Sequence, residues 1–244
     1  MLAMRIFDPV KKLGFVIPVK AGIQFDKNAG FRVKPGMTAF RKLHLTLILI
    51  LLSTVWWVPC SAQAAQSTIL VFGDSLSAAY GIPRESGWVT LLQQELQRSH
   101  PQYQVVNASI SGETTSGGLR RLQQALKQHQ PHIVILELGA NDGLRGAASK
   151  DIEANLATLI RQAQRSRAKV LLLGMRLPPN YGADYTTHFQ ALYTQLAQRY
   201  HTLLVPFLLE GITPDQFQAD NLHPVATAQP RILQNILREL KPQL

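Results

Sequence analysis

The stretch that decides the fold is ILVFGDSLSAAYG, residues 69–81, in which an apolar run stops abruptly at Gly-Asp-Ser. Four consecutive apolar residues that end at a turn signal are typical of a strand buried on both faces of a parallel sheet. The residues after it predict a tight turn and then a capped helix. Ser75, next to Asp74, therefore lies at the carboxyl end of a buried strand.

Similar short apolar runs recur along the chain, separated by longer amphipathic segments. Strands are expected at 69–72, 103–106, 133–138, 169–174 and 203–206, and helices at 88–98, 118–129, 152–167, 186–200 and 226–240. Pro230 lies in the last helix, which should start or kink there. This alternation favours a three-layer α/β/α sandwich with a mainly parallel, flavodoxin-like five-stranded sheet. In such sheets, ligands bind at the carboxyl ends of the strands.

The N-terminal quarter of the 244-residue chain has a different character. It holds most of the basic excess behind the net charge of +10. A basic pair precedes the apolar run 43–58, which is shorter than the roughly 20 residues of a membrane span. The small-x-small triplet AQA follows and ends at Ala64. This pattern predicts a secretory signal peptide at 37–64 that is cut after Ala64, with an uncleaved anchor helix as the alternative. Residues 1–36 are interpreted as a wrongly assigned or disordered extension.

The remaining segment, residues 65–244, has the length of a single domain. It holds no cysteine, because Cys60 is the one cysteine of the chain, so no disulfide is expected in the mature protein. No Lys/Arg stripe interleaved with aromatic residues is seen, so we expect no nucleic-acid partner. We expect a periplasmic or secreted monomer with a small-molecule substrate and no stable membrane anchor after signal cleavage.

A nucleophilic serine needs a base, a group that orients the base, and donors for the oxyanion. His223 lies in a loop expected at the same edge of the sheet as Ser75. Asp220 precedes it by three residues in DNLHP, and in a turn this spacing can bring its carboxylate beside the imidazole. Ser111 is a rival nucleophile, and Ser77 is interpreted as structural, on the first helical turn.

Two further residues follow predicted strands and could bind an oxyanion. Asn141, in GAND, has a side-chain NH₂, and Gly112, in SGET, offers an unhindered backbone N–H. The N–H of Ser75 is a third donor. Each also has a structural alternative, because Gly112 could serve only a turn and Asn141 could cap a helix. Asp74 suits capping or loop bracing, and Glu137 is expected to be hydrogen-bonded at the sheet edge without an assigned role.

These blocks, in this order, resemble the SGNH branch of the GDSL hydrolases. GDSLS, Gly112, Asn141 and DNLHP carry the resemblance, and SGET, ELGANDGLRG and MRLPPNYG are similar to the bacterial secreted thioesterase I/protease I/lysophospholipase group. The resemblance implies the SGNH hydrolase fold, with Ser75 as nucleophile, His223 as base and Asp220 as its orienting acid. One departure is Ala79, where this group often has glycine. Alanine narrows the backbone freedom at this position.

The resemblance also implies a substrate class. It points to a secreted hydrolase of acyl esters (acyl-CoA thioesters, lysophospholipids or aryl esters), with Leu144, Leu177 and Pro178 lining an acyl groove. No cofactor or metal is expected, since HExxH is absent from the sequence and SGETTSGG lacks the lysine of a phosphate-binding loop. The alternatives are a periplasmic short-chain aryl- or carbohydrate esterase, and a flavodoxin-like binding module without hydrolytic activity.

Overall fold

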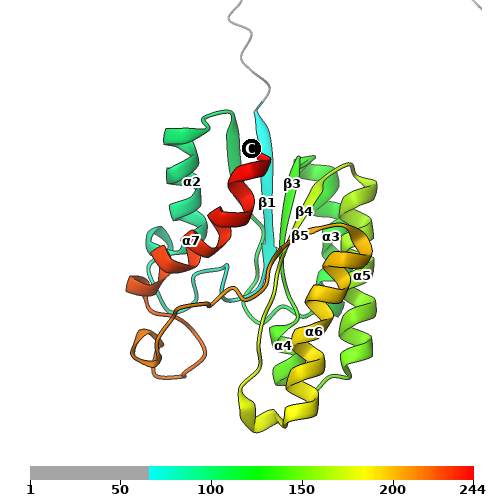
Figure 1. Ribbon diagram of the computed structural model, residues 1–244. Coiled ribbons are helices and arrows are strands. Elements are labelled where there is room, and N and C mark those ends of the chain that lie inside the picture. The colour runs from blue at the N-terminus through cyan, green and yellow to red at the C-terminus, as the bar shows by residue number, and fades with distance from the viewer. Residues whose placement is uncertain (1–65) are drawn as a thin grey trace, which may run out of the picture. The chain divides into compact units, whose positions relative to one another are not determined.

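Five parallel strands form the centre of the fold, which the computed structural model describes for residues 66–244. The strands are β1 (Ser67–Gly73), β2 (Tyr103–Asn107), β3 (Ile133–Glu137), β4 (Lys169–Leu173) and β5 (Leu203–Val205). Their order is β2-β1-β3-β4-β5, as in flavodoxin-like sheets (Figure 1). This order confirms the predicted sheet. The predicted extension, residues 1–36, and the predicted signal peptide, residues 37–64, lie outside the described residues.

Helices cover both faces of this sheet. They are α2 (Trp88–Ser99), α3 (Thr115–His129), α4 (Ala140–Leu144), α5 (Ser149–Arg165), α6 (Ala183–Tyr200) and α7 (Gln229–Leu240). Helices α2 and α7 pack together on one face, and α3, α5 and α6 cover the other (Figure 1). The three-layer prediction is therefore confirmed. Within residues 66–244, no helix has the length and apolar character that crossing a membrane requires.

Burial explains why residues 69–72 of β1 are all apolar. They are fully buried, because β1 is an interior strand with helices over both faces of the sheet. Neighbouring strands pair with it on both sides, and Ile69 stands opposite Val105 of β2 and Ile133 of β3. A strand in this position has no solvent-facing side on which polar residues could alternate.

Several predicted helix boundaries shift at the N-terminal end. Helix α3 begins at Thr115, three residues before the predicted start, because the Thr114 side chain caps it by accepting a hydrogen bond from the Gly117 N–H at 3.1 Å. Residues 226–228 form a 3₁₀ turn, and α7 begins only at Gln229, with Pro230 in its first turn. Helix α4 was not predicted, since five residues are too few to show a helical period.

The capped helix predicted directly after Ser75 is wrong. Residues 74–81 form a series of turns, and the next α-helix is α2. Ala79 has φ = +61° and Gly81 has φ = +73°, and this left-handed backbone is incompatible with a continuing helix. The Ala78 N–H donates to the Asp74 carbonyl at 2.9 Å, so Ser77 lies in a single helical turn that does not continue, and it is buried as a structural residue would be.

Ala79→Gly is expected to stabilise the protein by about 0.5–1 kcal/mol. A left-handed conformation costs a non-glycine residue about 1–2 kcal/mol, and this strain exceeds the extra entropy that glycine loses on folding. The measurement is the free energy of unfolding in urea. Ala78→Gly is the matched control, because Ala78 lacks a positive φ and should lose stability. Equal effects of the two substitutions would contradict the strain at Ala79.

Candidate active site

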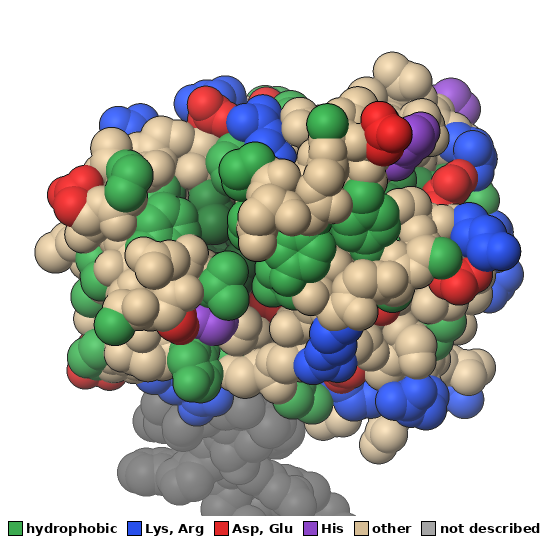
Figure 2. Space-filling model, turned by 90° about the horizontal axis from the view of Figure 1, so that it is seen from below, with side chains coloured by type: hydrophobic (Ala, Val, Ile, Leu, Met, Phe, Trp, Pro, Cys, Tyr) green, Lys and Arg blue, Asp and Glu red, His purple; other side chains and the backbone are tan. Residues whose placement is uncertain are grey.

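The site lies where the order of the strands reverses, between β1 and β3. At such a point the connections leave in opposite directions and open a crevice at the carboxyl ends of the strands. Ser75 follows β1, Gly112 lies in the loop after β2, and Asn141 is in the first turn of α4 after β3. Figure 2 views the molecule from this end, where hydrophobic side chains surround a hollow. His223 reaches the same place from the long segment after β5.

The structure brings Ser75, His223 and Asp220 into one hydrogen-bonded chain. The Nε2 atom of His223 lies 2.8 Å from the Ser75 Oγ, and its Nδ1 lies 2.7 Å from an Asp220 carboxylate oxygen. In the matching tautomer, Nδ1–H donates to Asp220 and Nε2 is free to accept the serine proton. Ser111 is exposed, and no histidine within residues 66–244 bonds to its hydroxyl.

The local turn keeps Asp220 ionised. Its Oδ1 accepts the backbone N–H groups of Leu222 at 2.9 Å and of His223 at 3.0 Å. Burial acts to raise the pKa of Asp220, but these two hydrogen bonds and the contact with the His223 side chain outweigh it and hold the pKa at about 2. The carboxylate is thus charged at neutral pH and suited to stabilise an imidazolium.

Two residues that the sequence did not reveal hold the histidine loop in place. The Gln218 side chain donates to the Tyr80 carbonyl at 2.9 Å, and its backbone N–H donates to the His223 carbonyl at 2.7 Å. The ring of Tyr80 packs against that of His223 with a centroid separation of 4.6 Å. An exposed tyrosine and a lone glutamine carry no sequence pattern, so only the fold could identify them.

The three predicted oxyanion donors differ in availability. The N–H groups of Ser75 and Gly112 have no hydrogen-bond partner among residues 66–244. Gly112 has φ = +76°, a conformation that favours glycine. The Asn141 Nδ2, by contrast, donates to the Asp74 carboxylate at 2.9 Å and to the Glu113 carbonyl at 3.0 Å. Both of its hydrogens are used, so Asn141 can serve an oxyanion only by sharing or releasing one.

Asp74 braces the turn rather than capping a helix. Its Oδ1 accepts the Leu76 N–H at 3.1 Å, and its Oδ2 accepts the Asn141 amide. Its own N–H donates to the Glu137 Oε2 at 3.1 Å. Asp74 therefore links the Ser75 turn to the ends of β3 and α4.

Glu137 is a fully buried acid directly beneath this turn. Its Oε2 accepts the Ser77 hydroxyl at 2.8 Å as well as the Asp74 N–H, while its Oε1 has no partner among the described residues. Burial, together with the nearby Asp74 carboxyl, raises the pKa of Glu137 well above its usual range. Burial also raises the pKa of Asp74, to about 6. Glu137 is thus a buried, hydrogen-bonded acid whose protonated form is favoured by its surroundings.

A cavity of about 290 Å³ opens beside the Ser75 hydroxyl. The predicted groove residues Leu144, Leu177 and Pro178 all line it. Its wall also includes three apolar residues that the sequence did not single out, which are Phe207, Leu209 and Phe217. These come from the segment between β5 and the histidine loop. Within residues 66–244, no three His, Cys, Asp or Glu side chains are grouped closely enough to hold a metal ion.

A serine bonded to a histidine that an aspartate orients, at the switch point of a doubly wound sheet, defines a class of serine-dependent hydrolases. A model of the GDSL-like lipase/acylhydrolase family matches residues 71–229. The chain belongs to this family. This confirms the resemblance read from the motifs and makes the protein an ester hydrolase.

Relatives and solved structures agree with this assignment. The esterase TesA of Pseudomonas aeruginosa is 50% identical over 184 residues, which cover 75% of this chain and 92% of that protein. The thioesterase 1/protease 1/lysophospholipase L1 of Escherichia coli K12 is 40% identical over 201 residues, covering 82% of this chain and 92% of that protein. The crystal structure of TesA covers 73% of this chain and 100% of its own, with 49% identity and a TM-score of 0.71.

Glu137→Gln is expected to gain stability relative to the wild type as the pH rises from about 4.5 to about 8. An unfolded glutamate ionises near pH 4.3, but in the folded protein burial favours the protonated form. Its contribution to stability is therefore complete below that pH and is lost as the pH rises toward the raised folded pKa. The amide does not titrate and escapes this loss.

The measurement is the free energy of unfolding in urea across this pH range. The exposed Glu85→Gln is the matched control and should run parallel to the wild type. Parallel pH profiles for Glu137→Gln and the wild type would show that Glu137 ionises normally.

Proposed function

We propose that the protein is a secreted serine hydrolase that transfers the acyl group of esters and thioesters to water through Ser75. The observation that carries the proposal is the Ser75–His223–Asp220 chain, with separations of 2.8 and 2.7 Å. It lies beside an apolar cavity and two N–H groups without partners in the described residues. These are the parts that acyl transfer requires.

The proposed reaction has two steps. The Ser75 Oγ attacks the acyl carbonyl while its proton passes to the His223 Nε2, and Asp220 stabilises the imidazolium. The N–H groups of Ser75 and Gly112 receive the oxyanion, and Asn141 joins them by sharing or releasing one of its hydrogen bonds. His223 then protonates the leaving alcohol or thiol. Water, deprotonated by His223, hydrolyses the acyl-enzyme and releases the acid.

The cavity favours acyl chains as substrates. Its lining is mainly aliphatic and aromatic, and such a wall binds hydrocarbon by removing it from water. We propose acyl-CoA-type thioesters, lysophospholipids and aryl esters as the substrate class, in keeping with the activities in the names of the relatives. The second candidate is a short-chain aryl- or carbohydrate esterase, which uses the same catalytic groups and only the mouth of the cavity.

The proposed site of action is the periplasm or the exterior. The predicted signal peptide, residues 37–64, supports this, with cleavage after Ala64 leaving a monomeric enzyme with no membrane anchor. Thioester hydrolysis would then be a capacity of the site, because esters derived from membranes are more accessible there than acyl-CoA.

Ser75→Ala is expected to abolish both covalent labelling by a fluorophosphonate and ester hydrolysis. The phosphonate reacts with a serine whose hydroxyl is activated by a neighbouring base, and alanine has no hydroxyl. The measurement is gel fluorescence of the labelled protein alongside hydrolysis of a panel of thioesters, lysophospholipids and short aryl esters. Ser111→Ala, which removes the rival nucleophile, is the control and should remain labelled. Labelling that survives Ser75→Ala would assign the nucleophile elsewhere.

Leu177→Thr is expected to lower kcat/KM for long-chain acyl esters by about tenfold while leaving acetyl esters nearly unchanged. Its side chain is buried in the cavity wall, and a site of this kind discriminates about 10- to 200-fold per methylene. The measurement is kcat/KM against acyl chain length. Leu177→Met keeps the apolar wall and is the control. An unchanged chain-length profile in Leu177→Thr would remove Leu177 from the acyl groove.

A further inference from the structure

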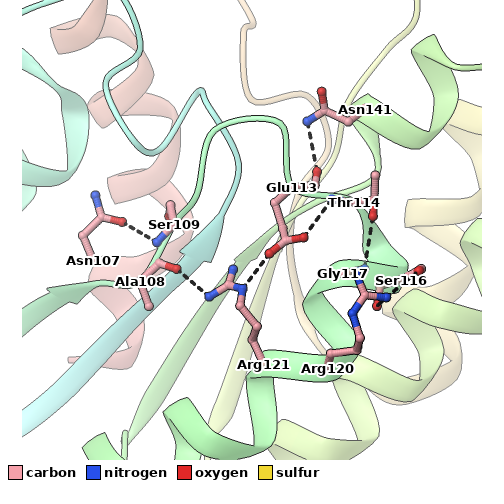
Figure 3. Close-up of polar contacts among 10 residues, drawn as sticks. All are labelled: Asn107, Ala108, Ser109, Glu113, Thr114, Ser116, Gly117, Arg120, Arg121 and Asn141. Atoms are coloured by element: carbon pink, nitrogen blue, oxygen red, sulfur yellow. Dashed lines mark hydrogen bonds and ion pairs between the residues drawn. The ribbon is translucent and has the colours of Figure 1, made fainter.

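The backbone of Glu113 connects two of the proposed oxyanion donors. It directly follows Gly112, and its carbonyl accepts the Asn141 Nδ2 at 3.0 Å (Figure 3). Its N–H closes the turn by donating to the Ile110 carbonyl at 3.1 Å. A displacement of Glu113 would therefore move the Gly112 N–H and remove an acceptor from Asn141 at the same time.

The side chain of Glu113 is tied to helix α3 through Arg121. Its Oε2 lies 2.6 Å from the Arg121 Nε, and its Oε1 accepts the Thr114 N–H at 3.2 Å. The Nη1 of Arg121 donates to the Ala108 carbonyl at 3.2 Å, so one guanidinium binds both ends of the loop 108–113 (Figure 3). The loop is thus held to a rigid helix by two directed hydrogen bonds.

This ion pair is built into the fold rather than displayed on the surface. The side chains of Arg121 and Glu113 are only 29% and 11% exposed. The guanidinium carbon of Arg121 lies 4.5 Å from the ring centroid of Phe72, in β1. A Cβ at Gly117 would clash with the Glu113 Oε1, so this glycine leaves room for the carboxylate.

We propose that Arg121 and Glu113 are positioning residues that hold the oxyanion-binding loop in register with Ser75. The inference rests on the proposed function. Desolvating a charged pair is unfavourable, and replacing one with apolar residues is often neutral or stabilising, so stability alone does not account for the pair. Transition-state stabilisation does account for it, because an oxyanion donor works only when it is already aimed at the developing charge. Arginine suits this role because its planar fork fixes the directions of its hydrogen bonds, whereas the donors of an ammonium group rotate.

The test compares Arg121→Met, Arg121→Lys and Glu113→Gln with Arg120→Met. Arg120 is the next residue on the same helix, but it is exposed and bonds only to Ser116, away from the loop (Figure 3). Removing one oxyanion donor typically lowers kcat by about 10²–10³-fold, and a misaligned donor should lose part of this. We expect kcat for a short aryl ester to fall about 10- to 100-fold in Arg121→Met, with KM within about twofold. Arg121→Lys and Glu113→Gln should lose less.

A second measurement distinguishes a loss of positioning of the oxyanion donors from a general destabilisation of the fold. Affinity for a trifluoromethyl ketone, which forms a tetrahedral adduct at the serine, should fall in proportion to kcat. Affinity for a long-chain alcohol, which fills the apolar cavity but presents no anionic oxygen to the donors, should remain unchanged, as should all values in Arg120→Met. A uniform loss of both affinities, or an unchanged kcat in the Arg121 and Glu113 variants, would overturn the inference.

Two controls keep these outcomes interpretable. Thermal unfolding identifies a variant that fails to fold, and if Arg121→Met does so, the conservative Arg121→Lys and Glu113→Gln decide the question. Ser75→Ala tests the proposed function separately. If it retains activity, the proposed function fails. If it is inactive while the Arg121 variants match the wild type, only the positioning inference fails.

Discussion

The pairing of β1 with β3 is the constraint on which the site depends. Their register places Gly73 opposite Glu137, the last residue of β3. The side chain of Glu137 then fills the space beside Gly73, where a Cβ would lie 2.6 Å from its Oε2. From this position the Glu137 carboxyl holds the Asp74 backbone and the Ser77 hydroxyl. The turn that carries Ser75 is therefore set by the end of the neighbouring strand.

The two acids Glu137 and Asp220 have pKa values shifted in opposite directions. Below the turn, burial disfavours the ionised form of Glu137 and raises its pKa. In the histidine loop, backbone N–H groups keep Asp220 ionised, with a pKa of about 2. The nucleophile thus lies between a buried acid that supports the backbone and a charged acid that can stabilise an imidazolium. Environment, rather than residue type, decides which role each carboxyl group can take.

Polar contacts between loops fix the remaining geometry of the site. Asp74 and Glu113 share the amide of Asn141, so the turn after β1, the loop after β2 and helix α4 meet at one nitrogen. Arg121 ties the second of these segments to α3. Each segment leaves a different strand, and hydrogen bonds of fixed direction bring them to one geometry. A rigid arrangement of this kind stabilises a transition state without reorganising during the reaction.

The layers, the strands and the identity of the family could be predicted from the sequence. Apolar runs without alternation specify buried strands, and GDSLS, Gly112, Asn141 and DNLHP come directly from the chain. The site residues that were predicted lie together at one edge of the sheet, and their catalytic roles remain predictions. The sequence was misleading at Ser75, where helix-forming residues occupy turns because Ala79 takes a left-handed conformation.

By itself, then, the sequence determined the order of the elements and the chemical groups that follow each strand, because both follow from local periodicity and residue type. Only the tertiary structure decided how these groups are partnered. Both hydrogens of Asn141 are engaged, Gln218 and Tyr80 secure His223, and Arg121 spans the loop before α3. Such contacts join residues far apart in the chain, and their distances depend on how the strands are ordered and the helices packed, which no local pattern encodes.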